Sequence, residues 1–154
     1  MVHVLYKKYI IILILSFCSA GILSAQTAAE LETLLKTSAV TYAQAARFIL
    51  KASEAADISS SREAFNFAVQ RNWLPKNVSP DSEARLDDIS LLFVQSFNLK
   101  GSLFFSLFKN KHYAYRELSA RGILKSKSDP LMTVSGEHLL YITGKILSIV
   151  EGNK

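Results

Sequence analysis

The sequence predicts an all-α protein built from short amphipathic helices. The 154 residues include only six Gly and three Pro, so residues that interrupt helices are few. No stretch rich in Val, Ile and Thr alternates apolar and polar residues as a half-buried strand does. Apolar residues instead recur three and four positions apart, the spacing of one helix face. With 49% hydrophobic residues the chain has enough apolar side chains for one core, which excludes a disordered tail.

The first three expected helices cover residues 28–36, 41–56 and 61–72. Their apolar faces are formed by Ala28, Leu31 and Leu35, then by Tyr42, Ala45, Ala46 and Ile49, and then by Ala64, Phe65 and Ala68. Thr41 is a favoured N-cap residue for the second helix. Pro75 and Pro80 make the segment after the third helix a loop.

The remaining expected helices cover residues 83–97, 103–108, 113–121 and 135–150. The clearest amphipathic pattern is that of the first of these, with Leu86, Ile89, Phe93 and Phe97 on one face. Residues 103–108 form an apolar run, which predicts a short buried helix. Gly122 is the expected C-terminal stop of the next helix. The last helix places Leu139, Ile142, Ile146 and Val150 on one face.

Two parts of the chain look alike at an offset of 50 residues. Residues 64–74 correspond to residues 114–124, and both end in a turn followed by Leu. The helices that follow keep the same offset, with Ala84, Ile89 and Phe97 matching Val134, Leu139 and Leu147. An earlier, partial copy starts at Val40. Self-similarity at a fixed offset is typical of stacked helical pairs.

The order of features in each copy resembles the S-layer homology repeat: a helix, a Gly-Ile-Leu-like turn, a polar loop with Pro and a capped helix. Residues 62–97 and 112–147 resemble two such repeats, and residues 40–52 resemble the closing helix of a third. The resemblance covers most of residues 26–154. It implies a pseudo-threefold bundle of helical pairs that holds an exported protein to cell-wall polysaccharide.

The Ile-Thr-Arg-Ala-Glu-like motif of that family is altered at all three corresponding places. Tyr42 takes the Arg position in the first copy and Gly136 takes it in the third. Leu86 takes it in the second copy, where Arg85 lies one position earlier. The cation that would contact an anionic polymer is therefore missing or shifted, so the resemblance implies the fold more strongly than the binding.

The N-terminus has the pattern of a secretory signal peptide at residues 1–25. Two lysines precede an apolar stretch at residues 9–17, and small residues lead to Ala25. The stretch is shorter than the roughly 20 apolar residues of a membrane-crossing helix. We expect cleavage after Ala25, with Ala20 as the alternative site, and a single domain at residues 26–154.

Export to the periplasm or cell envelope follows from this expectation. Lipidation of Cys18 is the less favoured route, because the bulky Phe17 stands where a lipoprotein signal has a small residue. Cleavage after Ala25 removes the single Cys, so the domain has no disulfide and depends on its apolar core. An exported protein is not expected to bind nucleic acid, despite the formal net charge of +5.

The sequence predicts neither an enzyme nor a metal or cofactor site. His112 and His138 lie far apart without the spacing of zinc ligands, and both are expected at the surface or at helix ends. Glu83, Asp87 and Asp88 are a weak alternative for glycan hydrolysis, which needs two carboxyl groups across a sugar bond. Neighbouring helical side chains diverge, and negative charge at a helix start complements the helix dipole.

The expected function is therefore non-catalytic binding of an anionic cell-wall or surface glycan. The candidate contacts lie at repeat turns or helix starts, where grooves between helix pairs would open: Arg71, Trp73, Arg85, Arg121 and Lys125. The alternative is a protein-interaction or scaffold subunit of the envelope that has lost glycan binding. Its docking surface would be formed by Phe104, Phe105 and Phe108, which core packing would otherwise bury. Basic and aromatic residues at 109–116 leave peripheral contact with phospholipid headgroups open.

Overall fold

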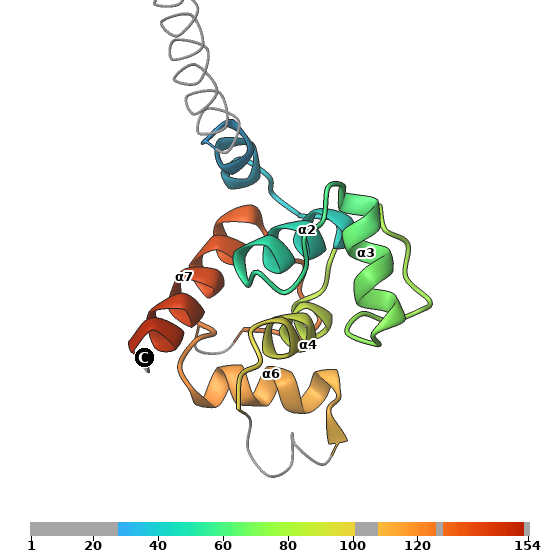
Figure 1. The fold of residues 1–154 in the computed structure, drawn as a ribbon. Helices are drawn as coiled ribbons and strands as arrows, with labels where there is room; N and C mark the ends of the chain where they lie inside the picture. Colours follow the sequence, from blue (N-terminus) through green and yellow to red (C-terminus); the bar gives the residue numbers. More distant parts are fainter. Residues whose placement is uncertain (1–27, 101–107, 126–127, 153–154) are drawn as a thin grey trace, which may run out of the picture. The chain divides into compact units, whose positions relative to one another are not determined.

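The computed structural model describes residues 28–100, 108–125 and 128–152 (Figure 1). This part of the chain is helical, which confirms the all-α prediction, and its only β-type pairing consists of two isolated bridges. The main helices are α2 (Tyr42–Ala52), α3 (Ser61–Gln70), α4 (Leu86–Ser96), α6 (Lys111–Ala120) and α7 (Gly136–Gly152). None of the described helices is long and apolar enough to cross a membrane. The expected signal peptide and residues 103–107 of the apolar run lie outside the described residues.

The chain divides into two compact units between Lys36 and Thr37. The unit that begins at Thr37 holds the five main helices. In the first unit a helix covers residues 28–35, close to the predicted range. Its leucines, Leu31 and Leu35, are both exposed.

Side-chain caps fix the starts of three helices. Thr41 caps α2 as predicted: its hydroxyl accepts a hydrogen bond from the Gln44 amide, and the Gln44 side chain accepts one from the Thr41 amide. Ser60 caps α3 and Asn110 caps α6 in the same way, each through the amide three residues later. Each cap satisfies an amide that the first turn of a helix leaves without a partner.

The start of α4 differs from the prediction. The helix begins at Leu86 rather than at Glu83, because Glu83 and Arg85 form isolated β-bridges with Thr41 and Thr133. Residues 83–85 are therefore held in extended backbone by other parts of the chain. An amphipathic pattern cannot reveal such pairing, since it depends on residues distant in the sequence.

The turns that end α3 and α6 have the same hydrogen bonds at residue numbers that differ by 50. Asn72 and Gly122 both have positive φ, 58° and 66°, which explains the Gly at the second position. The amide of Trp73 donates to Ala68, and that of Ile123 donates to Leu118, at 2.8 and 3.0 Å. The loops that follow keep this offset, with Ser82 donating to Ser79 and Met132 donating to Asp129.

Three segments from different parts of the chain meet in a closed ring of backbone hydrogen bonds. The Val40 amide donates to Val134, the Val134 amide donates to Ala84, and the Ala84 amide donates to Val40, at 2.8, 3.0 and 2.8 Å. All three residues are completely buried. Each lies two positions before the first residue of a helix, namely α2, α4 or α7. We call these residues the Val40–Ala84–Val134 ring.

The other helices pack on those that the ring brings together. α3 packs against α2, and α6 packs against α4 (Figure 1). The core includes large side chains from α2, α4, α6 and α7 that are fully buried, among them Ile49, Phe93, Leu118 and Ile142. The apolar faces predicted for α2, α4 and α7 are thus largely their buried faces.

Gly144 lies inside α7, where it lowers helix stability without serving a turn. A Cβ atom added there would meet nothing within 4 Å, and its φ is not positive. Replacing Gly144 by Ala is therefore expected to raise the free energy of unfolding by about 1 kcal/mol, the difference in helix propensity. Urea unfolding monitored by circular dichroism measures this. Gly122→Ala, at a positive φ, is expected to have the opposite sign.

Candidate functional site

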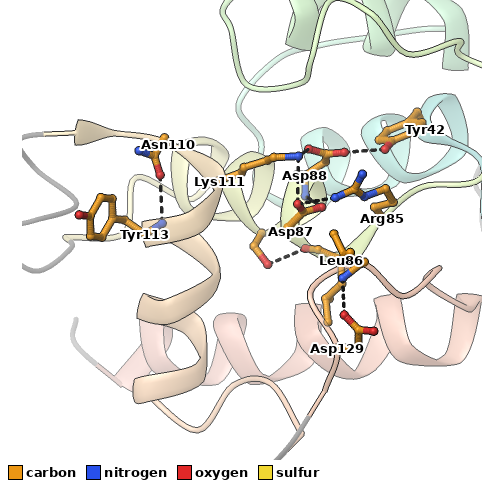
Figure 2. A network of polar contacts seen from close by, with 11 residues as sticks. Tyr42, Arg85, Leu86, Asp87, Asp88, Asn110, Lys111, Tyr113 and Asp129 are labelled. Carbon is orange, nitrogen blue, oxygen red and sulfur yellow. Dashed lines mark hydrogen bonds and ion pairs between the residues drawn. The ribbon is translucent and has the colours of Figure 1, made fainter.

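A cluster of charged and polar side chains ties together the starts of α2, α4 and α6 (Figure 2). We call it the Asp87–Asp88 cluster; its members are Tyr42, Arg85, Asp87, Asp88 and Lys111. Lys111 Nζ lies 2.9 Å from both Asp87 Oδ2 and Asp88 Oδ1. Arg85 Nη2 donates to Asp87 Oδ2 at 2.8 Å, and the Tyr42 hydroxyl donates to Asp88 Oδ2 at 2.6 Å.

Each member is placed by the beginning of a helix. Tyr42 and Lys111 are the first residues of α2 and α6, and Arg85 is the N-cap residue of α4. Asp87 and Asp88 lie in the first turn of α4, as expected from the helix dipole, but they are also buried, with exposed fractions of 6% and 2%. The two positive charges of Lys111 and Arg85 balance the two formal negative charges of these carboxylates, so the formal charge of the cluster is zero.

The protonation states of the cluster follow from its geometry. Burial, together with the hydrogen bond to Asp88, raises the pKa of Tyr42 well above that of an ordinary tyrosine. Burial acts to lower the pKa of Lys111, but its hydrogen bonds to the two carboxylates outweigh this and raise the pKa above 10.5. The phenol and the ammonium group thus keep their protons at neutral pH. The Asp87–Asp88 cluster therefore has the geometry of a structural link between α2, α4 and α6.

Two of the five predicted glycan contacts are held by internal partners. Arg85 donates to Asp87, and its Nε atom is buried without a hydrogen-bond partner among the described residues. Arg121 pairs with Glu117 at 2.8 Å and also donates to the backbone carbonyl of Lys100. In the described part of the chain, no interaction joins either cation to Arg71, Trp73 or Lys125.

Arg71 and Trp73 are brought together at the end of α3, where Phe67 joins them. The guanidinium carbon of Arg71 lies 4.4 Å from the centre of the Phe67 ring and 5.4 Å from that of Trp73. The two aromatic rings pack edge to face at 5.8 Å. Arg71 is exposed, and the two rings are half-buried. We call these residues the Arg71–Trp73 surface; Phe67 was missed, although it lies four residues before Arg71 on the predicted helix.

Lys125, the last predicted contact, lies apart in the turn after α6. It is exposed, and its Nζ atom lies 5.4 Å from the centre of the Tyr141 ring in α7. Tyr141 was not among the predicted contacts; Lys145 follows it by four residues on the same helix, whereas Lys125 precedes it by 16.

Of the three Phe residues predicted for partner docking, only Phe108 is described. It is 58% exposed, so it is not a core residue, and its ring stacks on Tyr113 at 5.4 Å. Phe104 and Phe105 lie outside the described residues.

Of the two places expected for His138, the surface or a helix end, the structure shows the helix end. His138 lies at the start of α7, where its amide donates to Ser135, but its side chain is buried rather than at the surface. Its Nε2 atom has no hydrogen-bond partner in the described part of the chain. Burial and then the charge of Lys125 lower the pKa of His138 below 6.5.

This shift predicts that acid weakens the fold. Below pH 6.5 the unfolded chain binds a proton at His138 that the folded chain does not, so the free energy of unfolding falls as the pH falls toward the folded-state pKa. Urea midpoints at pH 7.5 and pH 5.5 measure this dependence. His138→Leu is expected to reduce it, whereas His112→Leu, at an exposed site, should not. An unchanged dependence in His138→Leu would contradict the assignment.

Among the described residues, no group of three His, Cys, Asp or Glu side chains could hold a metal ion. Comparison of the chain with family models, with curated proteins and with solved structures found no match. The site must therefore be interpreted from its own geometry.

Proposed function

We propose that the chain is an exported, non-catalytic module of the bacterial envelope that binds an anionic cell-wall or surface glycan. The proposed architecture is a pseudo-threefold bundle of S-layer-homology-like helical pairs. Two observations support it: the Val40–Ala84–Val134 ring joins equivalent positions before three helices, and the turns after α3 and α6 share hydrogen bonds at an offset of 50. Export is proposed from the signal-peptide pattern at residues 1–25.

The observation that carries the binding proposal is the Arg71–Trp73 surface. An aromatic ring offers an apolar face to the C–H groups of a sugar, and a guanidinium donates paired hydrogen bonds to a carboxylate or phosphate. Arg71 and Trp73 supply both at one place, and the Arg71 side chain makes no ion pair in the described chain. The proposal therefore needs no Arg within the altered motif.

Arg85 and Arg121 have a different role in this proposal. Their side chains are held by Asp87 and by Glu117, so their charges are already matched inside the protein. We assign them to folding rather than to glycan contact. Lys125 remains exposed and belongs to a separate surface.

Variants of the Arg71–Trp73 surface test the proposal. Binding to purified anionic wall polymer is measured for Arg71→Gln, for Trp73→Ala and for the pair together. We expect the pair to weaken binding at least about tenfold, since one charged hydrogen bond and one stacked ring each contribute about 1 kcal/mol or more. Arg116→Gln, an exposed residue of α6, is the matched control. Full binding by the double variant would show that this surface does not bind the polymer.

The second candidate is a protein-interaction or scaffold subunit of the envelope. The exposure of Phe108, with its ring stacked on Tyr113, favours it. In this case the chain would be recovered with a protein partner, and Phe108→Ser would weaken that recovery while binding to wall polymer is absent.

A further inference from the structure

One side of α7 is open where the matching side of α4 is covered. In α4 this side is formed by Asp87, Leu91 and Val94, which are buried, and α6 packs against the helix. The residues 50 positions later are Glu137, Tyr141 and Gly144, and all three are exposed. Leu91 is 8% exposed and Tyr141 is 37% exposed. Among the described residues the space beside Gly144 is open, since an added Cβ atom would meet nothing within 4 Å.

Two ammonium groups approach the exposed aromatic ring on this side. Lys125 Nζ lies 5.4 Å from the centre of the Tyr141 ring, and Lys145 Nζ lies 5.8 Å from it. Tyr141 and Lys145 are four residues apart on α7 and so share a face. Lys125 reaches the same ring from the turn after α6.

Glu137 is the acidic residue on this side of α7 and lies four positions before Tyr141, but it forms no ion pair with either lysine. Neither Lys125 nor Lys145 makes an ion pair with any described acidic residue, in contrast to Lys111 in the Asp87–Asp88 cluster. The two ammonium groups lie 5.4 and 5.8 Å from the same ring centre, so an anion bound beside the ring would be attracted by both.

We propose that Lys125, Tyr141 and Lys145 form a second binding site, which takes the anionic group of an acidic sugar. This Tyr141 site rests on the proposed function for the class of polymer, but it uses none of the residues of the Arg71–Trp73 surface. The two lysines contact a carboxylate or phosphate group, and the exposed face of Tyr141 packs against the sugar ring. Gly144 leaves room for that ring beside the helix.

A neutral oligosaccharide lacks the group that the lysines recognise, and a small inorganic anion lacks the ring that Tyr141 contacts. The site therefore favours a ligand that carries both. A carboxylate sugar and a phosphate sugar share this chemistry, and separate probes distinguish them.

Nuclear magnetic resonance titration of the full chain tests the Tyr141 site. The probes are trigalacturonate, glucose 6-phosphate, neutral maltotriose and inorganic phosphate. We expect at least one of the two acidic sugars to shift the resonances of Tyr141, Lys125 and Lys145, with an affinity at least fivefold above that of maltotriose and of inorganic phosphate. Which sugar binds more tightly identifies the anionic group.

Variants give the matched comparison. Lys125→Gln, Lys145→Gln and Tyr141→Ala are each expected to weaken the acidic-sugar affinity at least threefold, whereas Lys109→Gln, at another exposed lysine, leaves it unchanged. Unfolding midpoints of each variant identify any that loses affinity because it fails to fold. Equal binding of acidic and neutral sugars, or equal loss in Lys109→Gln, would overturn the proposal.

The same experiment separates this inference from the proposed function. If Arg71→Gln with Trp73→Ala abolishes polymer binding but leaves the shifts at Tyr141, the two sites are independent and both stand. If polymer does not bind at all but the acidic sugar still shifts Tyr141, the proposed function fails and the Tyr141 site stands. Binding to phosphatidylglycerol vesicles through these lysines, with no shift from either acidic sugar, would overturn the site in favour of a lipid surface.

Discussion

Replacing Lys111 by Met is expected to lower the free energy of unfolding by about 3 kcal/mol. The change leaves two neighbouring carboxylates, Asp87 and Asp88, with one cation fewer, and removing one partner of a buried ion pair costs about 3–5 kcal/mol. We take the lower end because the Lys111 side chain is 41% exposed while those of the two carboxylates are 8% and 2% exposed. Urea unfolding at pH 7 measures the loss.

Two further variants show whether the loss comes from the cluster. Lys76→Met, at an exposed loop lysine, is expected to change the free energy of unfolding by less than about 0.5 kcal/mol. Adding Asp88→Asn to Lys111→Met should recover part of the loss, because it removes one of the unmatched charges. Equal effects of Lys111→Met and Lys76→Met would show that the cluster does not link the helices.

The direction of the Lys111 pKa shift fixes the pH range in which this residue stabilises the fold. The pKa of Lys111 is raised in the folded chain, so its contribution is fully present below 10.5 and is lost only as the pH rises through the raised value. Tyr42 acts in the same direction, since its raised pKa favours the neutral phenol in the folded state. The cluster therefore weakens in alkali, whereas His138 weakens the fold in acid.

Replacing Val134 by Pro is the second variant with a large expected effect. Proline removes the amide that donates to Ala84 and leaves a buried carbonyl without its partner. We expect a loss of about 3 kcal/mol or more in the free energy of unfolding. The preceding residue, Thr133, forms a β-bridge with Arg85, and extended backbone is compatible with a following proline.

Val134→Ala is the matched control for this variant. It removes more side-chain carbon than proline does but keeps the amide, and a loss of about 2 kcal/mol is expected from the cavity. The excess loss in Val134→Pro therefore reports the hydrogen bond of the ring. If alanine is as destabilising as proline, the ring contributes packing but no essential backbone bond.

The helices were predictable because their signals are local. Thr41 as a cap and Gly122 as a stop are short-range features, and both have the expected geometry. The position of the three altered motifs was also available from sequence, and Val40, Ala84 and Val134 open them. Their hydrogen bonding to one another could not be predicted, since the ring joins segments separated by 44 and 50 positions.

The candidate site was less predictable because its contacts are long-range. Lys111 was part of the basic and aromatic stretch at residues 109–116, for which contact with phospholipid headgroups was considered, yet it reaches two carboxylates 23 and 24 residues earlier. Arg85 was selected for ligand contact, but Asp87 holds it. Tyr141 carried no signal, as its importance depends on where the turn at Lys125 lies. Only the packing of α6 and α7 on the rest of the fold reveals these relations.

Co-sedimentation of residues 26–154 with purified cell-wall sacculi tests the central proposal most directly. Sacculi with and without their attached anionic polymer are compared over a series of salt concentrations. We expect the protein to pellet only when the polymer is present, and binding to weaken as salt screens the charges of Arg71 and of the lysines beside Tyr141. Failure to pellet with polymer-bearing sacculi at low salt, or equal pelleting after the polymer is removed, would contradict it.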